Sequence, residues 1–149
     1  MATGKITVAR ATWRDVVGVW RLERACFSGE AYDPLTLLLL VAWPGNVSLK
    51  AMNDQKLAGF IAGDEPGGDP FAWIVTLGVA PAHQRQGIGA RLLAECEARL
   101  TRPTLRLMVR ASNAPAIALY KKAGYVQVRT DAGYYSDGEA GLLMEKRRM

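Results

Sequence analysis

Apolar and polar residues alternate with two periods along this chain, and the changes of period divide it into elements. A period of two, as in TLRLMVR at residues 104–110, predicts a β-strand whose alternate side chains face a core. A period near 3.6 predicts an amphipathic helix with one apolar face. Strands are predicted at residues 6–10, 47–52, 56–64, 71–79, 104–110, 125–130 and 141–146.

The first helical pattern follows the first strand. Thr12 and Asp15 have the spacing of a capping box, with Asp in place of Glu or Gln, and predict a helix start. Apolar residues at helical spacing after this point are expected in the core, while Glu23 falls on another face. The expected core positions are Trp13, Val16, Val17, Trp20 and Phe27.

Further helices are predicted between the later strands. Residues 35–42 are apolar, lie between Pro34 and a WPGN turn, and are interpreted as a short buried helix. Residues 88–100 carry a regular amphipathic pattern that suits a helix lying against a sheet. The segment at residues 113–124 has a proline near its start and a glycine at its end, as helices commonly do.

The order of elements predicts a mixed α/β fold rather than a purely parallel one. Strands 47–52, 56–64 and 71–79 follow one another through short turns, so they are expected to pair antiparallel. A strand that follows a helix, such as 104–110, suits a crossover connection. The chain of 149 residues fits one domain, residues 1–149.

Composition and charge exclude several function classes. Half of the residues are apolar and 22% are charged, which is typical of a folded soluble domain. The apolar run at residues 35–43 is far shorter than the roughly 20 residues that cross a bilayer, and no secretory signal opens the chain. A cytoplasmic protein without a membrane partner is therefore expected. The formal net charge is +5, but the basic residues are scattered, so nucleic acid is not expected as a partner.

Cysteine and histidine give no sign of a metal site. Cys26 and Cys96 lie far apart in helical patterns and are expected to be buried free thiols rather than a disulfide or ligand pair. His83 has no partner motif and is interpreted as a solvated loop residue.

The hexapeptide QRQGIG, residues 84–89, lies between a strand and a helix. Backbone amides at a helix N-terminus attract phosphates, and glycines allow a ligand to approach the backbone closely. Leu92 stands where a dinucleotide fingerprint needs its third glycine, and no Walker A lysine follows the loop. The loop therefore suits a different phosphate-bearing ligand, or serves only as a tight turn.

Two motifs in register resemble the GNAT superfamily of acetyl-coenzyme A dependent N-acetyltransferases. Gln84, Gly87 and Gly89 match its glycine-bearing signature, and VRASNAPAIALYKKAGY at residues 109–125 matches its second block. The second block and GYYSDGEAGLLM look most like the branch that acetylates the terminal alanine of a ribosomal protein. The resemblance implies a mostly antiparallel sheet of about six to seven strands flanked by about four helices.

The resemblance also implies how acetyl-coenzyme A would bind. Backbone groups of residues 77–79 would pair with the pantetheine arm like an added strand, and amides of residues 84–89 would hold the pyrophosphate. Arg91 would add positive charge nearby, and Asn113 either contacts the cofactor or only caps the helix that follows it. The implied cofactor-binding residues are Leu77, Gly78, Val79, Gln84, Arg85, Gln86, Gly87, Ile88, Gly89 and Asn113.

Direct acetyl transfer needs a proton donor for the departing thiolate and a neutral amine. Tyr120 matches the family tyrosine that donates this proton, and a phenol with a pKa of about 10 keeps it at neutral pH. The oxyanion donor implied by the family is a backbone N–H near Val79. Met108 stands where the resembled branch carries a glutamate base, and Glu30 is the conceivable substitute.

The missing glutamate favours one class of acceptor. An α-amine of pKa about 8 is neutral about a tenth of the time at pH 7, a cost near 1.4 kcal/mol. A lysine side chain would cost roughly 4.6 kcal/mol, which a site without a base offsets poorly. The leading prediction is thus transfer to the α-amine of a protein or peptide N-terminus.

The acceptor site is expected in two loops, one around residues 27–32 and one around the tyrosine pair at residues 134–135. In the related enzymes such a pair lies near the substrate backbone, although here it would serve equally well as paired strand aromatics. A small-molecule amine, such as a polyamine, amino acid or aminoglycoside, and a non-catalytic coenzyme A binding module are the alternative functions. A monomer or homodimer is expected. The predicted acceptor-binding residues are Phe27, Glu30, Tyr32, Tyr134 and Tyr135.

Overall fold

The structure of the chain, a computed structural model, describes residues 5–27 and 31–148. Their strands form one seven-stranded sheet in the order β1-β2-β3-β4-β5-β7-β6. All described strand pairs are antiparallel except β4 with β5, so the predicted mixed α/β class is confirmed. The strands are β1 (Ile6–Arg10), β2 (Val47–Asn53), β3 (Lys56–Asp64), β4 (Phe71–Val79), β5 (Thr104–Arg110), β6 (Val126–Asp131) and β7 (Gly141–Arg147).

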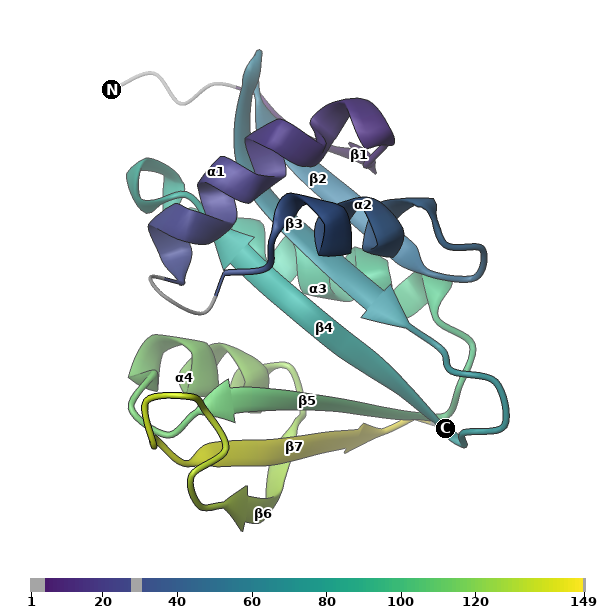
Figure 1. Cartoon of the computed structure of the whole chain (residues 1–149), viewed down its shortest axis with the longest axis vertical. Coiled ribbons are helices and arrows are strands. Elements are labelled where there is room, and N and C mark those ends of the chain that lie inside the picture. Colours follow the sequence, from purple (N-terminus) through teal and green to yellow (C-terminus); the bar gives the residue numbers. More distant parts are fainter. Residues whose placement is uncertain (1–4, 28–30, 149) are drawn as a thin grey trace.

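Helices cover both faces of the sheet, with α1 and α2 together on one face and α3 on the other (Figure 1). The capping box predicted at Thr12 and Asp15 is present, with the Thr12 N–H donating to Asp15 Oδ2 at 2.7 Å. Asp33 caps the next helix by accepting from the Thr36 N–H at 2.8 Å. The helices are α1 (Val16–Cys26), α2 (Pro34–Ala42), α3 (Ile88–Arg99) and α4 (Ala114–Lys122), with 3-10 turns η1 (Trp13–Asp15) and η2 (Pro81–His83).

The two halves of the sheet are joined over a short distance only. β4 and β5 pair from Phe71 opposite Thr104 as far as Ile74 opposite Leu107, and their remaining residues have no partner in each other. Figure 1 shows the two strands meeting at one end and diverging toward the other. Each half keeps its outer neighbour, since β4 pairs with β3 and β5 with β7 along most of their length.

A bulge in β4 lies at the point where the strands diverge. The register between β3 and β4 shifts by one residue at Val75, which is skipped between Ile74 and Thr76. A bulge of this kind changes the face to which the following side chains point. Ile74 packs into the core beside α3, whereas the Thr76 hydroxyl reaches the opposite side and donates to Glu23 on α1.

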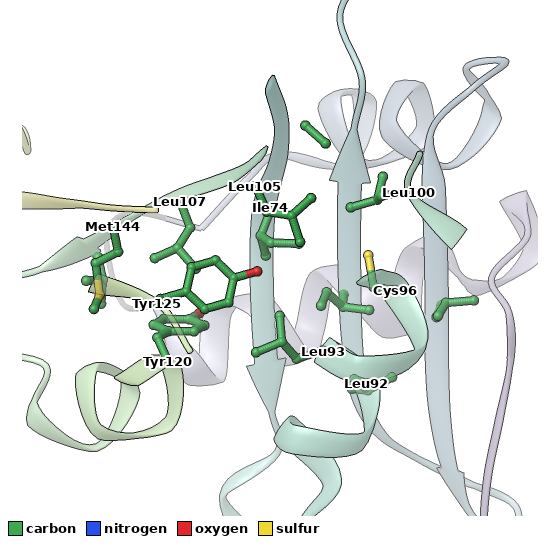
Figure 2. Packing of buried hydrophobic residues seen from close by; sticks show 14 of the residues in the cluster. Ile74, Leu92, Leu93, Cys96, Leu100, Leu105, Leu107, Tyr120, Tyr125 and Met144 are labelled. Carbon is green, nitrogen blue, oxygen red and sulfur yellow. The ribbon is translucent and has the colours of Figure 1, made fainter. Parts of the chain in front are cut away.

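The core has one part on each face of the sheet. The larger part lies beneath α3 and α4 and includes Leu92, Leu93 and Tyr125, several of which Figure 2 shows in contact around the sheet. The smaller part lies beneath α1 and α2, around Leu37 and Phe60. Burial on both faces explains the apolar continuity of the central strands.

The first helix begins later than its apolar pattern predicted. Trp13 is 66% exposed and lies against the guanidinium of Arg14, 5.4 Å from its ring centre, so the prediction of a core position was wrong. Trp13 belongs to η1, whose three residues per turn shift its phase relative to the α-helix. Val17 is exposed as well, whereas Trp20 packs against the smaller core as predicted. Phe27 follows the last residue of α1 as its C-cap.

The prediction that residues 35–42 form a buried helix was wrong in one respect. The helix is present, but only Leu37 and Val41, four residues apart, are buried against the sheet side. Leu35, Leu39 and Trp43 are 66%, 51% and 62% exposed. Because nearly every position of α2 is apolar, no polar face indicates which side of the helix faces solvent.

Candidate functional site

A cavity of about 710 Å³ lies where β4 and β5 separate. Its walls come from the diverging parts of these strands, the start and inner face of α4, the end of α1, and the loop between β6 and β7. The cavity thus brings together residues far apart in the chain, at the divergent end of the sheet. Among the residues predicted from sequence, Phe27, Tyr32, Leu77, Asn113, Tyr120, Tyr134 and Tyr135 line it.

The backbone of β4 beyond the bulge has one edge available. Leu77, Gly78 and Val79 pair with β3 on one side, and no described strand pairs with them on the other. An unpaired strand edge accepts an extended ligand through main-chain hydrogen bonds. The Val79 carbonyl already accepts from Gln84 Nε2 at 3.1 Å and from the Cys26 thiol at 3.3 Å.

The glycine-bearing loop leads directly into α3. Gly87 is the N-cap of the helix with a φ of +79°, and Arg85 has a φ of +65°. The first amides of α3 have no acceptor within the helix, which suits a diphosphate. Ile88 is buried in the core, whereas Gln86 is exposed with the rest of the loop. The predicted strand, loop and helix are therefore all present in the expected order.

Arg91, predicted to add positive charge near the cofactor, makes hydrogen bonds within the protein. Its guanidinium donates to Glu95 Oε2 at 3.0 Å and to the Ile6 carbonyl at 2.9 Å. Gly89 lies opposite α4, where an added Cβ would meet Leu119 Cδ2 at 3.4 Å. The second glycine of the motif thus lies at a close approach between α3 and α4.

Tyr120 is buried on α4 and faces the cavity. Its ring packs edge to face with Tyr125, with ring centres 5.9 Å apart, and Figure 2 shows the pair beside Leu107. Burial, with a smaller contribution from Tyr135, raises the pKa of Tyr120 to about 12. The phenol therefore holds its proton throughout the neutral range.

Asn113 caps the helix that carries Tyr120. Its side-chain oxygen accepts from the Ala116 N–H at 3.3 Å, so the capping alternative is realised. The same residue lines the cavity. A role toward a bound ligand stays a prediction beside this cap.

Tyr134 and Tyr135 lie in the loop before β7 rather than on paired strands. Their rings pack edge to face with centres 4.9 Å apart. The Arg110 guanidinium lies 4.2 Å from the ring centre of Tyr135 and also pairs with Asp137 and Glu139. This network fixes the tyrosine pair at the wall of the cavity.

Met108 lies where the resemblance expected a base. Burial alternates along β5 as predicted, with Leu105, Leu107 and Val109 buried and Met108 partly exposed, and Met108 is among the residues that line the cavity. A Cβ added to Gly141 would meet Met108 Cε at 2.8 Å, so the thioether lies close to β7. A thioether does not accept a proton at neutral pH. Glu30, the conceivable substitute, lies outside the described residues.

Glu23 is the site residue that the sequence reading missed. It was placed on a polar face of α1, but it is only 1% exposed and lines the cavity. Val16 and Val19 precede it by seven and four positions and are buried on the same helix face. A carboxylate in phase with an apolar stripe was the signal that could have found it.

The thiols and the histidine lie outside the lining of this cavity. Cys96 is buried as expected, but Cys26 is only half-buried, and both are free. His83 is half-buried rather than fully solvated, with its Nδ1 3.2 Å from Asn53 Nδ2. Within residues 5–27 and 31–148, no group of three or more His, Cys, Asp or Glu side chains could hold a metal ion. None of the described helices has the length and apolar character to cross a membrane.

Comparison with known proteins gives consistent matches across sequence and structure. The model of the acetyltransferase (GNAT) family matches residues 16–125. N-alpha-acetyltransferase RimI of Mycobacterium tuberculosis is 32% identical over 148 residues, which cover 97% of this chain and 94% of that protein. N-alpha-acetyltransferase 20 of Dictyostelium discoideum is 34% identical over 122 residues, 77% of this chain and 70% of its own. The crystal structure of the ribosomal-protein-S18-alanine N-acetyltransferase from Escherichia coli matches with a TM-score of 0.85 at 27% identity, covering 97% of this chain and 96% of that one.

Proposed function

Since the chain belongs to the acetyltransferase (GNAT) family and is an acetyl-coenzyme A dependent acyltransferase, we propose that its acceptor is the α-amine of a protein or peptide N-terminus. The relative that covers 97% of this chain is named as an N-alpha-acetyltransferase, which supports this acceptor. The observation that carries the proposal is the cavity of this chain, because tyrosines line it from two separate loops. Hydroxyl groups in such positions suit the main chain of a peptide.

The lining also argues against a small polycation as the acceptor. Glu23 and Asp64 are the only carboxylates among the described residues that line the cavity, and they come from different elements. A site for a polyamine or aminoglycoside would need several carboxylates close together. The tyrosine-lined walls favour a peptide with a single amine.

The residues present fit acetyl-coenzyme A. The unpaired edge of residues 77–79 would hold the pantetheine arm, and the amides from Gln84 to Gly89 would hold the pyrophosphate. When bound, the cofactor supplies an acetyl group activated as a thioester. Tyr120 lines the same cavity with its phenol protonated, which supports a role as the general acid.

Replacing Gly87 with valine tests the loop assignment. A left-handed backbone costs an L residue roughly 1–2 kcal/mol, and a φ of +79° at the N-cap orients the first amides of α3. We expect the Kd for coenzyme A, measured by calorimetry, to rise at least about tenfold. Gly68→Val is the matched control, because Gly68 has a φ of +80° with open space around it in another loop. Equal coenzyme A binding by both variants would contradict the assignment.

Acceptor choice is tested by release of free thiol from acetyl-coenzyme A. We expect peptides with a free N-terminal alanine to be turned over, and the same peptides with a blocked N-terminus to be inactive. Polyamines, free amino acids and aminoglycosides serve as the comparison set. Turnover of these small amines in preference to every peptide would contradict the proposed acceptor. Absence of turnover with any peptide, while coenzyme A binding stays intact, would also contradict the proposed acceptor.

Other expectations from the sequence stay predictions. These are a single domain over residues 1–149, a cytoplasmic location, a monomeric or homodimeric state, and the absence of nucleic acid and membrane partners. Sedimentation of the purified chain with and without coenzyme A measures the oligomeric state directly.

A further inference from the structure

A buried carboxylate at the cavity has one unsatisfied oxygen. Glu23 is 1% exposed, and its Oε2 accepts from the Thr76 hydroxyl at 2.7 Å. Its Oε1 is buried and, among the described residues, has no hydrogen-bond partner. A buried polar atom without a partner lowers the stability of the folded state, and more so when the atom is charged. Such an atom is explained when a water or a ligand supplies the partner.

The other buried glutamates show how unusual this is within the described chain. Glu97 accepts from the Tyr125 hydroxyl and pairs with Lys146 at 2.8 Å. Glu145 forms ion pairs with Arg106 of β5 at 2.9 Å and with Arg147 of β7 at 3.1 Å. Glu23 has no lysine or arginine partner among the described ion pairs, so its charge is not neutralised by the fold.

The surroundings of Glu23 place it on the acceptor side. It lines the cavity together with Phe27 and Tyr32, which come from the end of α1 and the segment before α2. Burial and the nearby charge of Glu23 raise the pKa of Tyr32. Met108 and Tyr120 line the same cavity. Glu23 is therefore one of the residues that line the cavity containing Tyr120 and lacking the expected base, and its unsatisfied oxygen is buried.

We propose that Glu23 accepts a proton from the substrate's α-ammonium group through a water in this cavity. The inference rests on the proposed function. The proton leaves the ammonium for the Glu23 carboxylate, and the neutral nitrogen forms its bond to the acetyl carbon as the carbon–sulfur bond breaks. The sulfur takes the proton of Tyr120, and the surplus proton on the new amide nitrogen returns to that phenolate. Glu23 finally releases its proton to solvent.

The protonation behaviour of Glu23 suits this role. Burial raises the pKa of its carboxyl above the usual range, while the Thr76 hydroxyl and the nearby Tyr32 backbone oppose the rise. A base whose pKa lies nearer the working pH transfers protons more effectively. Cys26 on the same helix and Tyr32 are the titratable groups that sense its charge. α2 carries no ionisable residue, and β3 carries Lys56 and Asp64 only at its two ends.

The pH profile of Glu23→Gln tests the proposal, because glutamine keeps the shape and can still accept from Thr76. An α-amine of pKa about 8 is neutral about a tenth of the time at pH 7 and about nine tenths at pH 9. We expect kcat/KM of the wild-type protein on an Ala-starting peptide to change less than about twofold over this range. The variant should rise about tenfold, so that the two converge at pH 9.

Two further variants separate proton transfer from a structural role. Glu97→Gln alters a second buried glutamate outside the cavity lining, and any effect should be equal at both pH values. Thr76→Val removes a hydrogen bond that lowers the pKa of Glu23, so this pKa should rise. The fall of kcat/KM at low pH, which we call the acid limb, should therefore move to higher pH. A Glu23→Gln profile parallel to wild type would overturn the proposal, as would an acid limb unmoved by Thr76→Val. Failure of the wild-type protein to turn over any N-terminal peptide would instead overturn the proposed function.

Discussion

Replacing Tyr120 with phenylalanine is expected to lower kcat by about 10²- to 10⁴-fold, the range for loss of a general acid. The ring lies buried at the cavity wall against Tyr125, so phenylalanine preserves the packing and removes only the hydroxyl. The departing thiolate then has no proton donor at this wall. Because coenzyme A would contact other elements, its Kd is expected to stay within about twofold of wild type.

The measurement is single-turnover acetyl transfer on an N-terminal peptide, with coenzyme A binding measured separately. Because the pKa of Tyr120 is about 12, the wild-type rate should show no alkaline fall from this group below about pH 11. Tyr134→Phe is the comparison, since Tyr134 lies at the cavity mouth and should change KM for the peptide more than kcat. A Tyr120→Phe protein with wild-type kcat would remove Tyr120 from the mechanism.

Replacing Tyr125 with alanine is expected to lower the free energy of unfolding by about 3–5 kcal/mol, as for other large aromatic truncations. Tyr125 is 1% exposed, and its hydroxyl donates to Glu97 Oε2 at 2.7 Å. This contact joins α3 to the second half of the sheet, where β4 and β5 pair only briefly. Loss of the ring also frees Tyr120 on one side, so kcat should fall as well.

Urea denaturation of Tyr125→Ala and Tyr125→Phe separates the ring from the hydroxyl. Phenylalanine keeps the packing but leaves Glu97 without its tyrosine donor, at an expected cost of about 1–3 kcal/mol. Burial and the hydrogen bond to Glu97 both raise the pKa of Tyr125, so the hydroxyl stays a donor throughout the accessible pH range. A cost below about 1 kcal/mol for the alanine variant would contradict the role given to this contact.

Most of the helices and strands could be predicted because most changes of period lie within a few residues of a real boundary. The capping box at Thr12 and the glycine at position 87 are local signals, so they could be read without knowledge of the tertiary structure. The orientation of α2 could not be predicted, because its uniform apolar composition has no polar face. Trp13 was misplaced because a 3-10 turn breaks the phase of the helix that follows.

The candidate site divides in the same way. The loop at residues 84–89 and Tyr120 belong to contiguous motifs, so they were found directly. The cavity itself depends on β4 and β5 diverging after Ile74, which no local pattern reports. Glu23 was assigned to a different helix face from the apolar residues, and its burial depends on packing between α1 and β4. Residues within one contiguous motif can thus be predicted from sequence, whereas residues brought together by the β4 bulge and by helix packing cannot.

The central claim is transfer of acetyl to an N-terminal α-amine, and one peptide tests it most directly. The peptide begins with alanine and carries an internal lysine, so that both kinds of amine compete in the same reaction with acetyl-coenzyme A. Fragmentation by mass spectrometry then locates the acetyl group. We predict acetylation of the terminal alanine with the lysine unmodified, and acetyl found on the lysine with a free N-terminus would contradict the account.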